Sequence, residues 1–397
     1  MARHPPLPAR PAPTAPGTDR ADRRLSPLAA ALPARVPFVG PEALERAAGR
    51  PFSARLGANE SLFGPSPLAV AAMAEAAGEA WKYGDPEGHD LRVSLAAHHG
   101  VAPANIVLGE GIDGLLGYLV RLYAGPGDAV VTSRGAYPTF DYHVAGFGAA
   151  LHAVPYRDDR EDAEALAEAA HRTGAKLVYL ANPDNPMGSW QAPGVVSALL
   201  DALPRNALLI LDEAYAEFAP AGAIPRLDVA DTRLVRLRTF SKAYGLAGLR
   251  VGYALAHPSV IAGFERVRAH FGVGRVAQAG ALAALGDPAH LDRVCRAVDE
   301  ARGRIAGIAA AHGLHGLPSA ANFVTVDCRS DGAFARRLLE ALGRRGMFLR
   351  MPFVSPEDRC IRVTCAPEAD LARFEAALGP ALEEVRAAVD EGPARPA

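Results

Sequence analysis

Short apolar runs alternate with amphipathic stretches through most of the chain. Seven runs have the length and composition of buried strands, namely Ile106–Leu108, Ala129–Thr132, Leu151–Val154, Leu177–Leu180, Leu208–Leu211, Leu234–Leu237 and Val251–Leu255. Helical patterns separate most of them, as in Pro67–Trp81, which Ser66 is placed to cap. Strands that alternate with helices predict an α/β fold, in which a mostly parallel seven-stranded sheet has helices on both faces.

The pattern changes after Asp287. The rest of the chain predicts helices at Ala289–Gly313, Ala333–Arg345 and Ala369–Ala388, and strands at Asn322–Asp327 and Cys360–Thr364. We therefore expect a large domain over residues 61–285 and a smaller α+β domain over residues 286–392. Residues 1–25 are rich in proline, alanine and arginine and have no periodicity, so we expect them to be disordered.

Composition narrows the class of protein. Half of the 397 residues are apolar and the formal net charge is −2, without a basic stripe that would indicate nucleic-acid binding. No apolar run is long enough to span a membrane, and the N-terminal segment lacks the apolar core of a signal peptide. The four cysteines have no metal-binding spacing and are typical of reduced thiols. We predict a cytoplasmic protein that uses no metal.

The segment between Thr239 and Arg250 has the most specific chemistry. It combines the amine of Lys242 with two small aliphatic hydroxyls, including that of Ser241, two glycines and a guanidinium. An amine can form a Schiff base with an aldehyde, and hydroxyls, backbone N–H groups and arginine bind phosphate. Pyridoxal 5'-phosphate (PLP) has both groups, so the segment predicts a PLP site. A lone lysine is more often a solvated loop residue, so the other motifs have to support this hypothesis.

Polar residues follow two of the predicted strands. Asp212 and Tyr215 come after Leu208–Leu211, where a carboxylate can keep the pyridine nitrogen of PLP protonated and a phenol can reach the ring hydroxyl. A helix cap and a packed aromatic are the alternatives. Asn185 lies in an Asn-Pro turn after Leu177–Leu180 and offers an amide to the same ring oxygen, or else only forms the turn.

Three motifs occur in a characteristic order. They read Asn-Pro-x-Asn-Pro-x-Gly at residues 182–188, Asp-x-x-Tyr at 212–215 and Ser-Lys-x-x-x-x-x-Gly-x-Arg at 241–250. Together they resemble the fold-type I PLP-dependent aminotransferases, and most of all the histidinol-phosphate aminotransferase-like branch. The resemblance extends from about Leu56 to Leu371.

The resemblance implies roles for individual residues. It makes Lys242, Asp212 and Tyr215 catalytic, and it assigns cofactor binding to Gly111, Ile112, Asp113, Tyr137, Asn185, Thr239, Ser241 and Arg250. Gly111 to Asp113 open a helix, whose N-terminus favours an anion. Tyr137 corresponds to the aromatic residue that stacks on the cofactor ring, with a core aromatic as the alternative.

Substrate binding is assigned to Arg362, Arg350 and Asn59. Arg362 lies inside an apolar strand, where an unpaired charge is costly, and it matches the family arginine that binds the substrate carboxylate. Arg350 matches a second anion-binding arginine, with a surface charge as the alternative. The family also implies that residues 26–60 form an arm that joins the small domain. It further implies a homodimer with shared active sites, in which the Asn59–Gly64 loop reaches the partner's site.

The chain departs from the family at three positions. Phe63 replaces a tyrosine whose hydroxyl binds the cofactor phosphate of the neighbouring subunit, Gly114 replaces a glutamate and Met187 replaces a threonine. The resemblance implies amino transfer between an amino acid or amino-phosphate and a 2-oxo acid, and leaves histidinol phosphate open as a substrate. A PLP-dependent decarboxylase, lyase or oxygen-using oxidase would share the cofactor motifs. A PLP-domain transcription regulator would need a winged-helix domain, for which the N-terminal segment is too short.

Overall fold

The computed structural model describes residues 24–33, 39–226 and 228–390. The chain divides into two units, residues 1–36 and 37–397. The first unit contains the short helix α1 (Pro27–Ala31), which Ser26 caps. The expected disorder of residues 1–25 concerns positions that lie almost entirely outside the described residues. All other elements belong to the second unit.

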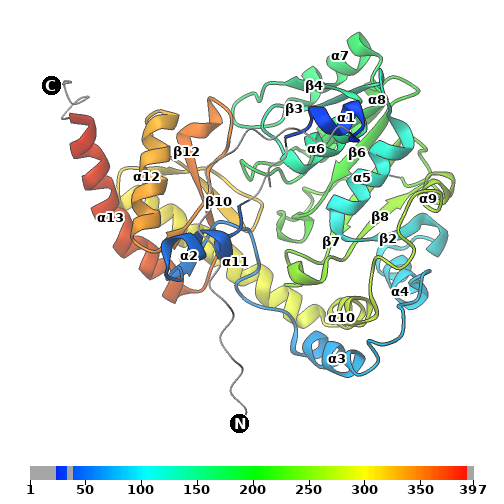
Figure 1. The fold of residues 1–397 in the computed structure, drawn as a ribbon, viewed down its shortest axis with the longest axis horizontal. Helices are drawn as coiled ribbons and strands as arrows, with labels where there is room; N and C mark the ends of the chain where they lie inside the picture. The colour runs from blue at the N-terminus through cyan, green and yellow to red at the C-terminus, as the bar shows by residue number, and fades with distance from the viewer. Residues whose placement is uncertain (1–23, 34–38, 227, 391–397) are drawn as a thin grey trace. The chain divides into compact units, whose positions relative to one another are not determined.

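A seven-stranded sheet forms the large part of the second unit (Figure 1). Its spatial order is β2–β8–β7–β6–β5–β3–β4, and its strands are β2 (Ile106–Gly109), β3 (Ala129–Ser133), β4 (Ala150–Val154), β5 (Leu177–Ala181), β6 (Leu208–Asp212), β7 (Leu234–Thr239) and β8 (Gly252–Ala256). Strand β8 is antiparallel to both of its neighbours, and the other pairs are parallel. The prediction of a mostly parallel sheet of these seven strands is confirmed.

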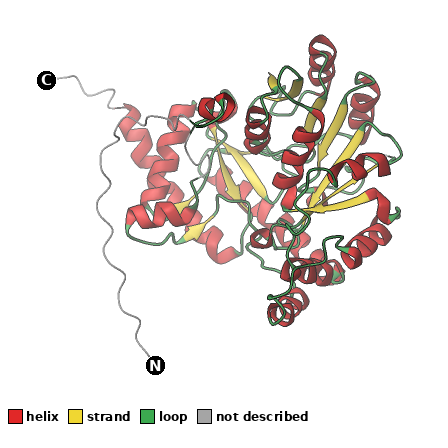
Figure 2. Cartoon of the chain, turned by 45° about the vertical axis from the view of Figure 1, so that its right-hand side comes forward, coloured by secondary structure: helices red, strands yellow, loops and turns green. Residues whose placement is uncertain are grey.

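Helices cover both faces of this sheet (Figures 1 and 2). One face packs against α5 (Gly111–Tyr123), α6 (Pro138–Gly146) and α9 (Pro258–Phe264), and the other against α7 (Ala163–Thr173) and α8 (Pro193–Ala202). Strand β5 shows why: Tyr179 faces the first layer, whereas Val178 and Leu180 face the second, because neighbouring side chains alternate across a strand. A strand buried on both faces is apolar throughout, which is the pattern that made it predictable.

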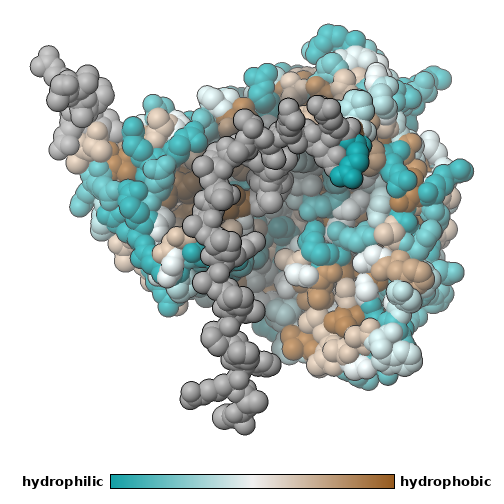
Figure 3. Space-filling model, viewed as in Figure 1, coloured by the Kyte–Doolittle hydropathy of each residue, from teal (hydrophilic) through white to brown (hydrophobic). Residues whose placement is uncertain are grey.

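Three further helices cover the β2 end of the second face, namely α3 (Pro67–Ala77), α4 (His89–His99) and α10 (Arg275–Leu285). Helix α3 is shorter than predicted, because it stops at Gly78 instead of continuing to Trp81. Leu68 and Val70 of α3 are exposed. Figure 3 shows apolar residues gathered at the lower right of the molecule, over α3 and α10.

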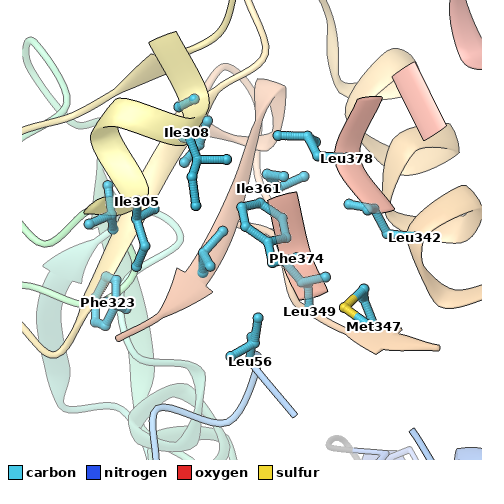
Figure 4. Packing of buried hydrophobic residues seen from close by; sticks show 14 of the residues in the cluster. Leu56, Ile305, Ile308, Phe323, Leu342, Met347, Leu349, Ile361, Phe374 and Leu378 are labelled. Carbon is cyan, nitrogen blue, oxygen red and sulfur yellow. The ribbon is translucent and has the colours of Figure 1, made fainter. Parts of the chain in front are cut away.

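A second core lies among the C-terminal elements (Figure 4). It is built by the antiparallel sheet β12 (Cys360–Thr364), β10 (Phe323–Asp327) and β9 (His315–Gly316) with helices α11 (Pro288–Ala311), α12 (Gly332–Arg344) and α13 (Glu368–Asp390). The parallel pair β1 (Ala54–Arg55) and β11 (Met347–Phe348) also contributes, after α2 (Pro41–Ala48). The predicted helices and two longer strands form within two residues of their expected bounds. Strands of two residues carry no readable period, and these were missed.

Candidate active site

A cavity of about 350 Å³ opens where the parallel strands of the large sheet end. Strands β5, β6 and β7 end beside it, at Ala181, Asp212 and Thr239. The predicted site residues that line it are Asn59, Ile112, Asp113, Tyr137, Asn185, Asp212, Tyr215, Thr239, Ser241, Lys242, Arg250, Arg350 and Arg362. Gly111 is not part of this lining, but it directly precedes Ile112, and a Cβ at Gly111 would contact the lining residue Arg250. The predicted residues therefore come together in one cavity, at the edge where α/β sheets place their ligand sites.

Lys242 reaches into the cavity from the loop after β7. Its Nζ donates a hydrogen bond to the backbone oxygen of Asn59 at 3.1 Å and lies 5.6 Å from the centre of the Tyr215 ring. Burial lowers the pKa of Lys242 to about 8, and the positive charge of Arg362 acts in the same direction. A larger share of neutral amine makes Lys242 a better nucleophile and base than an exposed lysine.

Asp212 and Glu213 show how neighbouring carboxylates acquire different properties. Glu213 is buried against Arg236 and Arg238, at N–O distances of 2.8 and 2.7 Å. Burial alone would raise the pKa of Glu213, but the two guanidinium groups outweigh it and the pKa is lowered. Asp212 points the other way and forms no ion pair within the described part of the chain, so burial raises its pKa to about 6. Asp212 is thus the carboxylate that is free to pair with a cationic ligand.

Another end of the cavity, formed by Arg250, Ser241 and the start of α5, has the groups of an anion-binding site and is called the anion cradle. Arg250 donates to Ser241 Oγ at 3.4 Å and to Asp113 Oδ2 at 3.3 Å, and Tyr137 donates to Asp113 Oδ1 at 2.7 Å. Helix α5 begins at Gly111, where φ is +74°. A Cβ at this glycine would stand 2.5 Å from Arg250 Nη2, so a larger residue would displace the guanidinium. Exposed N–H groups at the helix start and a cation beside them fit a phosphate.

Two polar groups stand between these ends. Tyr215 accepts a hydrogen bond from Asn59 Nδ2 at 3.1 Å, and burial raises its pKa to about 12, so it remains a phenol. Asn185 lines the cavity, but its Oδ1 accepts a hydrogen bond from Arg362 Nη1 at 2.5 Å. Asn185 is therefore connected to the arginine that was predicted to bind substrate, and only its amide nitrogen remains for a cofactor oxygen.

Arg350 and Arg362 lie together at the far side of the cavity. An antiparallel bridge joins their backbones, with Arg362 N donating to Arg350 O at 2.7 Å. Arg362 Nη2 also donates to Gly57 O at 3.3 Å, whereas its buried Nε finds no partner among the described residues. Burial lowers the pKa of Arg362 to about 10 and lowers that of Arg350. Two partly desolvated guanidinium groups, with the unsatisfied Nε–H of Arg362 among the described residues, fit an incoming anion.

Two residues that the sequence did not suggest contribute to the site. Tyr179 lines the cavity, and its hydroxyl donates to Asp212 Oδ2 at 2.8 Å. In the sequence, only its hydroxyl inside an otherwise aliphatic strand could have indicated this role. Asn322, just before β10, donates to the backbone oxygens of Asn59 and Glu60 at 3.1 and 3.2 Å. No local pattern marks it, because its partners lie more than 260 residues away.

These residues fit PLP in both chemistry and arrangement. The cavity offers an amine with a lowered pKa, a buried carboxylate that pairs with no cation among the described residues, and an anion cradle in which a glycine leaves room for the Arg250 guanidinium. Among the described residues, no group of three histidine, cysteine or acidic side chains is placed to hold a metal ion. No helix in the same part of the chain is long and apolar enough to cross a membrane.

Comparisons with known proteins agree with this chemistry. The family model for aminotransferase class I and II matches residues 54–378. Histidinol-phosphate aminotransferase from Roseiflexus castenholzii is 40% identical over 351 residues, which are 86% of this chain and 93% of that protein. The enzyme of the same name from Anaeromyxobacter sp. is 38% identical over 357 residues, covering 89% and 97%.

Solved structures point the same way. The crystal structure of histidinol-phosphate aminotransferase from Sinorhizobium meliloti in complex with pyridoxal-5'-phosphate has a TM-score of 0.89 and 51% sequence identity. The match covers 92% of this chain and 99% of that one. Aspartate aminotransferase from Thermus thermophilus, at 22% identity and a TM-score of 0.75, shows the fold alone.

Proposed function

We propose that this chain, which belongs to the class I and II aminotransferases, uses histidinol phosphate as amino donor and a 2-oxo acid as acceptor. Membership in the family makes it a PLP-dependent transaminase of small molecules. The names of its relatives support the choice of donor. The observation that carries the proposal is the presence of two arginines, Arg350 and Arg362, in the same cavity as Lys242.

The enzyme selects the amino donor by binding the phosphate group of this substrate. Histidinol phosphate has an amine and a phosphate monoester but no carboxylate. Two guanidinium groups side by side suit a dianionic phosphate, and they suit the carboxylate of a 2-oxo acid when that substrate takes the donor's place. Because the two substrates occupy the site in turn, one pair of arginines can serve both.

We assign the chemical steps to the lining residues as follows. Bound PLP supplies an electron sink for the substrate carbon that carries the amino group. Lys242 Nζ would hold the cofactor through its amine and, when that amine is free, would act as the base that moves the proton of this carbon. Asp212 keeps a proton on the pyridine nitrogen, and Tyr215 and Asn185 orient the ring oxygen. Tyr137 covers the ring, and Asn59 orients the substrate beside Arg362.

The cofactor phosphate is assigned to the cradle. Arg250, Ser241 and Thr239 contact it from one side, and the N–H groups at the start of α5 contact it from the other. Ser241 Oγ lies 2.9 Å from Thr239 Oγ1 and accepts from Arg250 Nη1 at 3.4 Å, and we assign its hydroxyl hydrogen to the phosphate. The assignment accounts for Gly111, where any Cβ would push Arg250 out of place.

The departures from the family do not weaken this assignment. Phe63, Gly114 and Met187 are absent from the residues that line the cavity in the described chain. Phe63 packs against the core of the C-terminal elements. A Cβ at Gly114 would stand 2.9 Å from Glu110 Oε2, so the position suits glycine beside this carboxylate.

The assembly we infer is a cytoplasmic homodimer with shared sites. Large apolar side chains are exposed on and near α3, including Leu68, Val70, Trp81, Tyr83 and Phe271, and the rings of Tyr83 and Phe271 are 4.8 Å apart. An exposed apolar patch of this kind is typical of a protein–protein interface. Light scattering should give the mass of two chains at assay concentration. A fully active monomer would exclude shared sites.

We also propose the domain limits expected from the sequence, with an arm over 26–60, a large domain over 61–285 and a small domain over 286–392. The pairing of β1 with β11 and the position of Leu56 in the C-terminal core support the role of the described part of this arm.

The test of the donor is a half-reaction without acceptor. The enzyme loaded with PLP is mixed with histidinol phosphate, histidinol or L-aspartate, and loss of the bound-cofactor absorption is followed. We expect rapid loss with histidinol phosphate and at least a hundredfold slower loss with histidinol, about 2.7 kcal/mol for the missing charged contacts. Equal rates for histidinol phosphate and histidinol would refute the proposed donor and leave the aminotransferase assignment intact.

A further inference from the structure

Tyr179 connects the core of the large sheet to the cavity. It lies in β5, is fully buried, and stacks on Phe140 with ring centres 4.8 Å apart and planes 20° apart. Strand β5 pairs in parallel with β6, so that Ala181 lies opposite Asp212. Tyr179 is two residues before Ala181 and therefore on the same face of the sheet. From this position its hydroxyl donates to Asp212 Oδ2 at 2.8 Å.

The two oxygens of Asp212 have one fixed donor each. Oδ2 accepts from Tyr179, and Oδ1 accepts from the backbone N–H of Ala214 at 3.0 Å. The backbone oxygen of Asp212 accepts from Asn182 N at 2.8 Å. Each carboxylate oxygen can accept a second hydrogen bond, so a place remains for a donor on the cavity side. The carboxylate is held in one orientation before any ligand binds.

The surroundings of Asp212 otherwise oppose its ionised form. Burial and the nearby carboxylates of Asp113 on α5 and of Glu213, just after β6, raise its pKa, whereas the hydroxyl of Tyr179 and the Ala214 N–H lower it. The other titratable groups that act in this region are Glu161, Tyr137, Tyr215 and Lys242. Burial raises the pKa of Tyr179 far above its usual value, so this phenol stays protonated and always donates. Among the described residues, Tyr179 is the one side chain that donates to Asp212, so a substitution can remove this hydrogen bond.

We propose that Tyr179 is a positioning residue for the reaction: its hydroxyl keeps Asp212 oriented and weakly basic, so that the proton between Asp212 and the pyridine nitrogen stays on nitrogen. The inference rests on the proposed pairing of Asp212 with the cofactor. Without the hydroxyl, Asp212 becomes a stronger base and takes this proton from the ring. No atom is gained or lost in this change, because one proton moves between two heavy atoms. A ring without the proton is a weaker electron sink.

The experiment follows the ring nitrogen directly. Wild type, Tyr179→Phe, Tyr253→Phe and Asp212→Asn are loaded with PLP carrying ¹⁵N in the ring, and the ¹⁵N shift is recorded against pH. Tyr253→Phe is the matched control, because this tyrosine is also buried in the sheet and its hydroxyl meets His99 Nε2 at 2.8 Å, away from the cavity lining. We expect the midpoint of ring deprotonation to fall by about one pH unit in Tyr179→Phe, a tenfold change in proton affinity. We expect no change in Tyr253→Phe.

Kinetics give a second readout. With Tyr179→Phe, kcat should fall about tenfold while KM stays within about twofold, since the substrate end is untouched. A midpoint equal to that of Tyr253→Phe would overturn the role of Tyr179 and leave the pairing of Asp212 standing. A ring signal that is the same in wild type and Asp212→Asn would overturn the pairing itself, and with it the role of Tyr179. Neither result bears on the identity of the amino donor.

A second variant covers the case in which Tyr179→Phe does not fold. Replacing Tyr179 with 3-fluorotyrosine keeps the ring and the hydroxyl but makes the hydroxyl a stronger donor. The midpoint of ring deprotonation should then rise above that of wild type. An unchanged or lower midpoint would contradict the proposal.

Discussion

The two ends of the cavity are built in different ways. At the cofactor end, Asp212, Thr239 and Lys242 stand at or just after the ends of neighbouring strands of one sheet. At the substrate end, Arg362 is held by Arg350 through a backbone bridge and by Gly57, which is 305 residues away in sequence. The first end is fixed by a rigid, doubly covered sheet, whereas the second depends on segments that meet only when the C-terminal core has formed.

The electrostatics of the two ends differ as well. The cofactor end contains a carboxylate that burial makes easier to protonate and an amine that burial makes easier to deprotonate. The substrate end contains two partly desolvated guanidinium groups. Proton transfer and anion recognition are therefore tasks of separate segments, and the ends interact through the charge of Arg362, which lowers the pKa of Lys242.

The largest expected effect is at Lys242. Lys242→Ala removes the nucleophile and base, and transamination should fall by at least about a thousandfold. PLP should still bind through the cradle and Asp212. The chain has only three lysines, which makes Lys176→Ala a clean control. Borohydride reduction of the loaded enzyme followed by peptide mass analysis should label Lys242. A label on Lys82 or Lys176 would refute the assignment.

Substitutions of Asp212 and of its neighbour Glu213 should have different effects, the first on catalysis and the second on stability. Asp212→Asn should lower kcat by about a hundredfold, about 2.7 kcal/mol, because a neutral amide does not hold the pyridinium proton. Glu213→Gln should instead lower the free energy of unfolding by about 3 kcal/mol, since Arg236 and Arg238 lose a buried partner. Kinetics and denaturant unfolding of both variants check this. A rate for Asp212→Asn within threefold of wild type would make Asp212 merely structural.

A pH profile tests whether the two ends are electrically coupled. The pKa of Lys242 is lowered from 10.5 to about 8, so about a tenth of the amine is neutral at pH 7. The rate at which the cofactor-free protein captures PLP should rise with pH until about 8 and then level off. Arg362 contributes to this lowering, so Arg362→Gln should move the midpoint upward. A capture rate that keeps rising to pH 10 in wild type would contradict the lowered pKa.

The same difference explains what the sequence could predict. The residues of the cofactor end lie within four positions of strand ends, and apolar runs and turn residues mark those ends along the chain. Tyr179 was missed because a tyrosine inside a buried strand follows the pattern of the core, and only the partner strand reveals the use of its hydroxyl. The bridge between Arg350 and Arg362 and the contacts of Asn322 depend on two-residue strands and distant partners. Neither leaves a local period in the sequence.

The claim that the two ends have separate tasks is tested most directly by comparing cofactor affinity and substrate preference in one variant, Arg362→Gln. Arg373→Gln serves as an exposed control. The dissociation constant of PLP is measured by equilibrium dialysis, and kcat/KM is measured for histidinol phosphate and for histidinol. The account predicts that PLP affinity stays within about twofold of wild type while the preference for histidinol phosphate falls by about 10- to 100-fold, the worth of a charged hydrogen bond. An unchanged preference, or a loss of PLP affinity as large as the loss of preference, would contradict the account.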